Sequence, residues 1–260
     1  EEQGIIKHGV WLDRLRKRIT ESREVTVFLS SPFQGLLLER AGLVERKGPS
    51  LVALCESKGV RLHFVDLRWG ITSTMSDNFL TVKTCLDAIR GSDIFVGFYG
   101  QRYGASVLDG KSANWLQPSL ELCYEDFPWL KDHAPLADVL VSVEGNTTTK
   151  TCTQKSVTHL EFECGYNDEH AGSDGSEDPA GPVVGFAFFR GQQFDDYHMR
   201  KDEKEAWKYQ AENLESRQCL AQLRRDTRMW AERGRGACFE YGTPEDFVEE
   251  ATKQLHDVLQ

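Results

Sequence analysis

The segment VTVFLSSPF, residues 25–33, decides the fold. Its first five residues, Val25–Leu29, form an apolar run that is typical of a β-strand covered on both faces of a sheet. Ser30, Ser31 and Pro32 end this strand, and a helical stretch follows over about residues 35–57. A second apolar strand follows over residues 60–65. A strand, a helix and a second strand in succession predict a parallel sheet with its connecting helix packed on one face.

The same alternation continues to the end of the chain. A helix with an apolar stripe from Val82 to Ile89 precedes a strand over residues 94–98, and a helix that begins at Ser156 precedes a strand over residues 183–189. A polar loop then leads into helical sequence over about residues 201–233, a short strand and a last helix capped by Thr243. This pattern predicts an α/β fold, a flavodoxin-like doubly wound parallel sheet of five strands in the order 2-1-3-4-5.

The chain is predicted to form one domain with two irregular segments. Residues 1–24 are predicted to be an N-terminal amphipathic helix or linker, and residues 25–260 the α/β domain. About residues 105–155 fit the alternation poorly and are interpreted as an insertion before the helix that carries Glu161. Residues 167–181 are polar and rich in Gly and Asp, and are predicted to be a mobile loop.

Composition narrows the functional class. The formal net charge of −10 argues against nucleic acid as a partner, and no apolar run is long enough to predict a membrane span. The seven cysteines form no CxxC pair, which favours free thiols in a reducing compartment and predicts a cytoplasmic protein. The chain opens with Glu rather than Met, so we expect a fragment of a longer protein.

The residues after the first three strands form a candidate binding site. Doubly wound sheets bind ligands outside the carboxyl ends of their strands, where the strand order reverses. These segments are rich in Gly, Arg, Ser and aromatic residues. Such residues can bind the phosphate and ribose groups of a nucleotide and stack on its rings. The candidate ligand-binding residues are Ser30, Ser31 and Phe33 after the first strand, Arg68, Trp69 and Gly70 after the second, and Tyr99, Gly100, Arg102 and Tyr103 after the third.

One carboxylate is expected beside this site. In a helix that begins at Ser156, Glu161 shares a stripe with Val157, Leu160 and Cys164. A carboxylate on such a stripe is either paired with a cation or held in a cleft for chemistry. Because the helix begins at the same edge of the sheet, we interpret Glu161 as the candidate catalytic residue. No spacing of metal ligands and no nucleophile elbow occurs, so neither a metal nor a resident cofactor is predicted.

A single carboxylate beside a nucleotide is chemically sufficient to cleave an N-glycosidic bond. The reaction passes through an oxocarbenium-like state, which a carboxylate near the ribose stabilises. Nicotinamide is a good leaving group, so a second carboxylate is not required. NAD, as substrate rather than cofactor, fits this chemistry.

Four motifs, in order, resemble those of a known family. They are VFLSSPFQGLLLER, VDLRWGIT, FVGFYGQRYG and SVTHLEFECG, which begin at residues 27, 65, 95 and 156. They are similar to motifs of the domain of unknown function that precedes NACHT or related NTPase modules in telomerase-associated vault proteins, nephrocystin-like proteins and NACHT–WD-repeat proteins. That family is related to TIR domains, several of which hydrolyse NAD with a glutamate that corresponds to Glu161. The chain departs from the family pattern at Pro32, Gly35 and His159.

The resemblance implies three hypotheses. In the first, the chain is a TIR-like module of a NACHT/STAND-type signalling or innate-immunity protein. It self-associates when the downstream NTPase and repeat modules of the same chain assemble, and in that assembly it acts as an NAD glycohydrolase. In the second, it is a non-catalytic self-association or docking domain of a scaffold protein, with Glu161 in a structural ion pair with Arg68 or Arg102. In the third, it senses a nucleotide without turnover.

Overall fold

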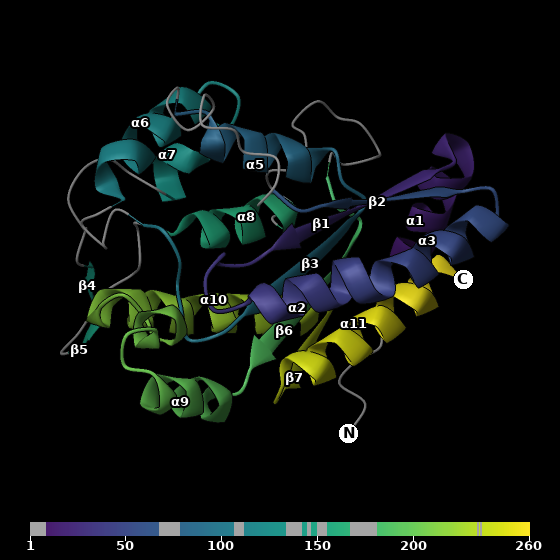
Figure 1. Cartoon of the computed structure of the whole chain (residues 1–260). Helices are drawn as coiled ribbons and strands as arrows, with labels where there is room; N and C mark the ends of the chain where they lie inside the picture. Colours follow the sequence, from purple (N-terminus) through teal and green to yellow (C-terminus); the bar gives the residue numbers. More distant parts are fainter. Residues whose placement is uncertain are drawn as a thin grey trace.

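A five-stranded sheet is the centre of the computed structural model, which describes residues 9–67, 79–106, 112–133, 142–144, 147–149, 155–166, 181–232, 234 and 236–260. The strands lie in the order β2-β1-β3-β6-β7 (Figure 1), and every neighbouring pair is parallel. Their bounds are β1 Glu24–Ser30, β2 Arg61–Val65, β3 Ile94–Tyr99, β6 Val184–Arg190 and β7 Gly236–Tyr241. The predicted α/β class and the strand order 2-1-3-4-5 are confirmed.

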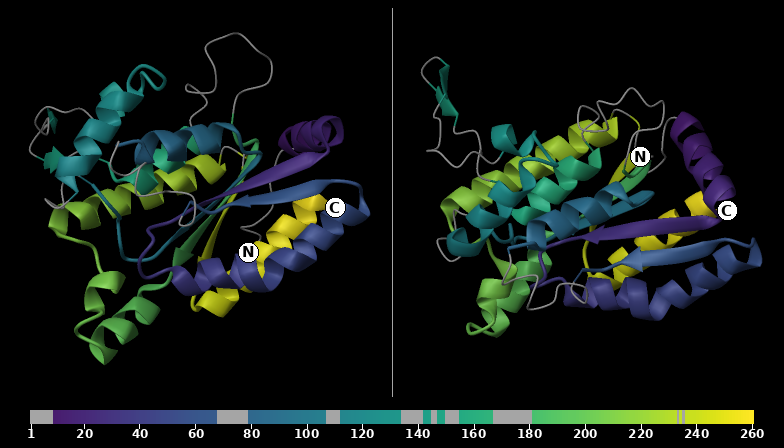
Figure 2. Two further views of the ribbon diagram at one scale, coloured as in Figure 1. Left: turned by 45° about the horizontal axis from the view of Figure 1, so that its top comes forward. Right: turned by 90° about the horizontal axis from the view of Figure 1, so that it is seen from above.

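Helices cover both faces of the sheet (Figures 1 and 2). One face packs against α1 (Gly9–Ser22), α2 (Leu37–Ala41), η1 (Gly42–Lys47), α3 (Gly48–Ser57) and α11 (Pro244–Leu259). The other packs against α5 (Thr81–Arg90), α6 (Ala113–Cys123), α8 (Val157–Tyr166) and α10 (Leu214–Glu232). Successive side chains of a strand point to opposite faces, so Val27 and Phe28 of β1 belong to different core clusters. Burial on both faces explains why the strands are continuous apolar runs.

The register of the strands brings their carboxyl ends to one edge of the sheet. Ser30 of β1 pairs with Gly97 of β3, and Tyr99 of β3 pairs with Phe189 of β6. The segments that follow β1, β3 and β6 therefore begin side by side. The order of the strands reverses between β1 and β3, which is where such sheets bind ligands.

The predicted insertion lies between β3 and α8. It contains α6, α7 (Leu130–His133) and an antiparallel pair of short strands, β4 (Ser142–Glu144) and β5 (Thr147–Thr149). Helix α6 packs against α5, whereas Figure 2 shows the β4–β5 pair standing away from the main body. The insertion thus extends the layer of helices on one face without adding a strand to the central sheet.

The segment after β6 is more helical than its sequence predicts. The predicted polar loop before residue 201 is instead largely α9 (Gln192–Lys201). A short 3₁₀ helix, η4 (Ala206–Tyr209), then leads to α10. The expectation of a loop is wrong because the polar side chains of α9 face solvent on one side, while Asp195 is buried on the other. The predicted mobile loop lies outside the described residues, apart from Gly181 at its end.

Most of the cysteines that the structure describes are thiols. Free cysteines are Cys55, Cys85, Cys123, Cys164 and Cys238, but Cys219 is disulfide-bonded. The expectation of free thiols therefore holds for the first five and is wrong for Cys219. None of the described helices has the length and apolar character needed to cross a membrane.

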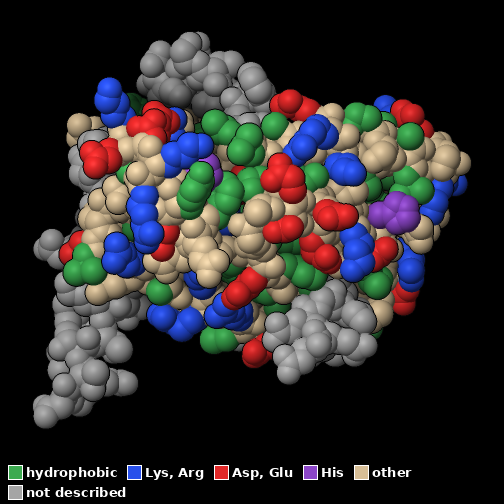
Figure 3. Space-filling model, turned by 60° about the horizontal axis from the view of Figure 1, so that its bottom comes forward, with side chains coloured by type: hydrophobic (Ala, Val, Ile, Leu, Met, Phe, Trp, Pro, Cys, Tyr) green, Lys and Arg blue, Asp and Glu red, His purple; other side chains and the backbone are tan. Residues whose placement is uncertain are grey.

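On the face shown in Figure 3, acidic and basic side chains are interspersed.

Candidate functional site

Helix α8 places Glu161 under the carboxyl end of β1. The helix begins as predicted, because the Ser156 hydroxyl accepts a hydrogen bond from the backbone N–H of His159 at 3.2 Å. The backbone N–H of Val157 donates to the carbonyl oxygen of Ala105, in the segment after β3, at 3.0 Å. These two contacts fix the start of α8 at the edge where the strands end. Glu161, just over one turn into the helix, is only 7% exposed.

The carboxyl group of Glu161 has neutral hydrogen-bond partners. The Ser30 hydroxyl donates to Oε2 at 2.6 Å, and the thiol of Cys85 on α5 is a second partner. Burial raises the pKa of Glu161 above its ordinary value, and the Ser30 hydrogen bond, the charge of Arg40 and the Cys85 hydrogen bond oppose this only in part. Among the described residues, no cation forms an ion pair with Glu161. A buried carboxyl without a paired cation is a common property of groups that act in catalysis.

The nearby Arg40 is committed to other partners. Its guanidinium is buried and pairs with Asp66, just beyond β2, at 2.7 Å. Nε also donates to the Ser31 hydroxyl at 2.9 Å, and Nη2 to the Ser31 carbonyl oxygen at 3.1 Å. Arg40 therefore joins α2 to the ends of β1 and β2 and acts on Glu161 only through its charge. Arg40 was not predicted as a site residue, although it lies on α2, the first helix after Ser30 and Ser31.

The two predicted stacking tyrosines are buried. Tyr99 is fully buried and packs against Phe189 of β6, with ring centroids 5.3 Å apart. Tyr103 is also fully buried, and its hydroxyl lies 2.8 Å from Nδ1 of His159. In this arrangement both rings belong to the core cluster on the α8 face of the sheet. Their predicted role in stacking on a ligand stays a prediction that requires them to become exposed.

Around this edge Arg102 is partly buried and Phe33 is exposed. The guanidinium of Arg102 pairs with Glu212 at 3.1 Å, donates to the carbonyl oxygen of Trp207 at 2.8 Å and lies over the Trp207 ring. The hypothesis of an ion pair between Glu161 and Arg102 is therefore wrong, because Glu212 is the partner of Arg102. Phe33 is 45% exposed, with Arg40 lying 5.6 Å from its ring centroid. Arg68, Trp69 and Gly70 lie outside the described residues.

A second buried ionic cluster holds the segments at the same edge. Arg190, the last residue of β6, pairs with Glu39 and Asp195, each at 2.5 Å, and donates to the carbonyl oxygen of Gly35 at 2.8 Å. Asp195 in turn accepts a hydrogen bond from the backbone N–H of Gln101 at 3.0 Å. Arg190 therefore fixes the segment after β1 directly, and the segment after β3 through Asp195. We name Arg190, Glu39 and Asp195 the Arg190 cluster.

Two glycines allow close approaches beside the Arg190 cluster, Gly35 to the backbone at Lys208 and Gly100 to the Arg190 guanidinium. Gly35 has a φ of +82°, and a Cβ atom there would lie 2.2 Å from the carbonyl oxygen of Lys208. A Cβ at Gly100, one of the predicted site residues, would lie 2.9 Å from Nη2 of Arg190. Gly100 is thus where the backbone approaches a buried guanidinium. The cluster was not predicted from the sequence. A charged residue at the end of an apolar strand, here Arg190, is the signal that indicates a buried ion pair at this edge.

The predicted site residues therefore fall into separate groups. Ser30 and Glu161 are in direct contact, and Ser31 is linked to them through Arg40. Gly100 contacts the Arg190 cluster, and Tyr99 and Tyr103 are buried beside α8. Arg102 and Phe33 lie further out. The structure thus places the buried carboxyl of Glu161 at the strand-order reversal, with hydroxyl and thiol partners and the charge of Arg40 nearby.

Comparisons with known proteins agree with the motif resemblance over part of the chain. Residues 26–117 match a family described as a domain of unknown function (DUF4062). This match runs from β1 into α6, covers about a third of the chain and ends before the helix that carries Glu161. No solved structure matches the chain.

Three relatives are long proteins of which this chain covers a small part. A TPR repeat-containing protein of Dictyostelium discoideum is 38% identical over 114 residues, which are 43% of this chain and 7% of that protein. Telomerase protein component 1 of Rattus norvegicus is 37% identical over 82 residues, which are 32% of this chain and 3% of that protein. NACHT domain- and WD repeat-containing protein 1 of Mus musculus is 32% identical over 72 residues, which are 25% of this chain and 5% of that protein. The chain thus spans less than a tenth of each of these relatives.

Proposed function

We propose that this chain is a TIR-like module of a larger NACHT/STAND-type signalling protein of innate immunity. In this proposal it cleaves the N-glycosidic bond of NAD or a related nucleotide when the module self-associates. Two relatives support the larger setting, since their names include a NACHT domain with WD repeats and TPR repeats. The flavodoxin-like sheet supports a ligand site at the carboxyl edge of β1 and β3.

The proposed catalytic activity rests on the burial, hydrogen-bond partners and pKa of Glu161. It is a buried carboxyl at the strand-order reversal, its described hydrogen-bond partners are neutral, and its pKa is raised. A structural carboxylate in such a place is normally paired with a cation, because an unpaired buried charge is unfavourable. A catalytic carboxylate instead keeps its charge available for the transition state, here the positive charge that develops on the ribose ring.

Ser30 and Cys85 have a supporting role in this mechanism. Ser30 holds Oε2 of Glu161 at the end of β1 by a hydrogen bond, and the Cys85 thiol is a second hydrogen-bond partner. When the nicotinamide–ribose bond breaks, the carboxylate faces the oxocarbenium-like centre, and water or a ribose hydroxyl completes the displacement. Only the ionised form of Glu161 can do this, so the raised pKa predicts that the rate increases as the pH rises through that pKa.

The experiment follows free nicotinamide after NAD is mixed with the chain, both as an isolated protein and when clustered by fusion to an oligomeric scaffold. Glu161→Gln removes the charge but keeps the shape, and Glu163→Gln is the matched control, because Glu163 lies on the same helix and pairs with Lys155. We expect turnover in the clustered wild type and the control, and a loss of about 100-fold or more in Glu161→Gln. Equal turnover in all three proteins would remove Glu161 from the mechanism.

A second candidate function, docking without catalysis, is favoured by the close packing of the segments after β1 and β3 against the start of α8. A Cβ atom at Gly104, where φ is +99°, would lie 3.1 Å from Oγ1 of Thr158 and 3.6 Å from Pro32. The segments after β1 and β3 therefore meet the first turn of α8, which restricts access in this arrangement. A well-folded clustered chain that binds no nucleotide and releases no nicotinamide would support docking. One that binds NAD without cleaving it would support nucleotide sensing.

A further inference from the structure

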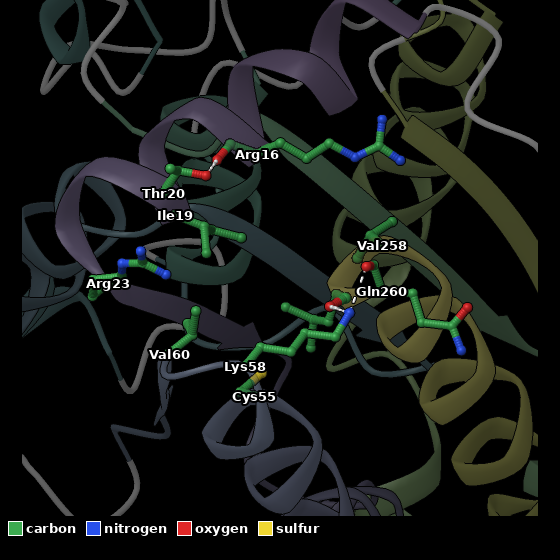
Figure 4. Close-up of a pocket in the computed structure, with 10 residues that line it drawn as sticks. Arg16, Ile19, Thr20, Arg23, Cys55, Lys58, Val60, Val258 and Gln260 are labelled. Atoms are coloured by element: carbon green, nitrogen blue, oxygen red, sulfur yellow. Dashed lines mark hydrogen bonds between the residues drawn. The ribbon is translucent and has the colours of Figure 1, made fainter.

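A cavity lies at the opposite edge of the sheet from Glu161. It is open to solvent on one side and is lined by the C-terminal parts of α1, α3 and α11 and by the residues just before β1 and β2. Figure 4 shows Ile19 of α1 on one side, Val258 of α11 on another, and the Lys58 side chain reaching from the end of α3 towards α11. None of the residues discussed above as site candidates lines it.

The wall of the cavity is largely apolar. Its volume is about 200 Å³. Cavities of about 150 Å³ with apolar walls bind benzene, so this space is large enough for one aromatic or branched side chain. The apolar lining residues are Ile19, Cys55, Val60, Val258 and Leu259. A ligand that covers this surface gains by removing it from water.

The rim of the cavity is cationic. Arg16, Arg23 and Lys58 line it, and none of the described lining residues is Asp or Glu. This differs from the chain as a whole, which has 41 acidic and 31 basic residues. An anionic ligand therefore meets an attractive local charge here, although the whole protein is negatively charged.

The three cationic side chains differ in the hydrogen-bond and ion-pair partners that they already have. Lys58 donates to the carbonyl oxygens of Leu259 and Gln260, at 3.3 and 2.5 Å, and so caps α11. Arg16 pairs with Asp13 at 3.3 Å, in a contact that is largely exposed to solvent. The guanidinium of Arg23 has no hydrogen-bond or ion-pair partner among the described residues, and Arg23 is exposed. Arg23 is thus the cation most available to a ligand.

We propose that this cavity binds an acidic peptide segment of a partner protein, which inserts one apolar side chain between α1 and α11. The apolar wall would receive that side chain, and Arg23 and Arg16 would meet the flanking carboxylates. A small inorganic anion fits less well, because it leaves the apolar wall of the cavity uncovered. The inference concerns a different edge of the sheet and does not depend on the activity proposed for Glu161.

The test measures binding of a fluorescent peptide, Asp-Glu-Phe-Glu-Asp, by fluorescence anisotropy. Control peptides replace Phe with Ser, or the acidic residues with Lys. Arg23→Asn removes the available charge with a residue that tolerates the φ of +58° at this position. Thr20→Trp places a large ring at the exposed edge of the lining, and Arg217→Gln, on α10 and away from the cavity, is the matched control for loss of one charge.

We expect the acidic peptide with Phe to bind at least about 10-fold more tightly than either control peptide, and added salt to weaken its binding. Arg23→Asn and Thr20→Trp should each weaken it about 3- to 10-fold, while Arg217→Gln should not. Thermal unfolding of each variant establishes whether it is folded. If Thr20→Trp is not folded, the result for Arg23→Asn decides the outcome. Equal binding of the three peptides, no binding, or binding of the Phe peptide that ignores Arg23→Asn would overturn the proposal.

Discussion

At the scale of single residues, the two buried clusters at the carboxyl edge differ in their charge balance. The Arg190 cluster joins one guanidinium to two carboxyl groups, Glu39 and Asp195, by short contacts. Glu161 has a hydroxyl and a thiol as partners, and its nearest described cation, Arg40, is paired with Asp66. The first arrangement is typical of structural support, and the second of a group retained for chemistry.

This difference predicts the effect of Glu161→Gln on stability. The raised pKa of Glu161 means that the folded state binds its proton more tightly than the unfolded state, so its contribution to stability falls as the pH rises above about 4.5. Replacement by neutral Gln should therefore leave the free energy of unfolding at pH 7 unchanged or raise it by about 1 kcal/mol. Urea unfolding at pH 7 measures this change. A loss of more than about 2 kcal/mol would instead indicate a structural carboxylate.

The Arg190 cluster predicts the opposite response. Arg190→Met leaves Glu39 and Asp195 buried without their cation, and should lower the free energy of unfolding by about 3–5 kcal/mol at pH 7. Loss of the guanidinium raises the pKa of both carboxyl groups further, so the variant should be less destabilised at pH 5 than at pH 7. The combination of Arg190→Met with Glu39→Gln and Asp195→Asn should recover part of the loss. A pH-independent loss that these substitutions do not relieve would show that packing, not charge, is responsible.

At the scale of elements, the sequence predicted the strands and helix caps, which depend on interactions between residues close in the chain. The apolar runs, the Ser156 cap and the Thr243 cap all appear in the structure, because burial on two faces and capping act within a few residues. The Arg190 cluster was not predicted, because its members lie on three elements and only the tertiary fold brings them together. Helix α9 was missed because its sequence is largely polar and its one buried residue, Asp195, forms an ion pair with Arg190 at the end of β6 instead of belonging to an apolar stripe.

The cap of α11 gives a prediction at this scale. The Thr243 hydroxyl accepts from the backbone N–H of Asp246, and the Asp246 side chain accepts from the backbone N–H of Thr243. Thr243→Ala should lower the free energy of unfolding by about 1 kcal/mol, whereas Thr243→Ser should change it by less than half of that. Denaturant titration of the two variants beside wild type measures both values. Equal values for Ala and Ser would show that the hydroxyl contributes nothing.

At the scale of the whole molecule, the two edges of the sheet have different properties. The carboxyl edge holds the buried Glu161 and, at the start of α8, a close approach of Pro32 and Thr158 to Gly104. The amino edge holds a cavity with an apolar wall and a cationic rim. The two proposals therefore assign chemistry and partner binding to opposite edges of the sheet. Fold and strand order were predictable from the sequence, but the second site was not, because its lining comes from three helix ends that are distant in the sequence.

Release of nicotinamide from NAD by the clustered chain tests the central claim most directly, with wild type, Glu161→Gln and Glu163→Gln measured at the same protein concentration. We expect release by the wild type that rises with pH through the raised pKa of Glu161, comparable release by Glu163→Gln, and about 100-fold less by Glu161→Gln. Undiminished release by folded Glu161→Gln, or no release by any of the three proteins when clustered, would contradict it.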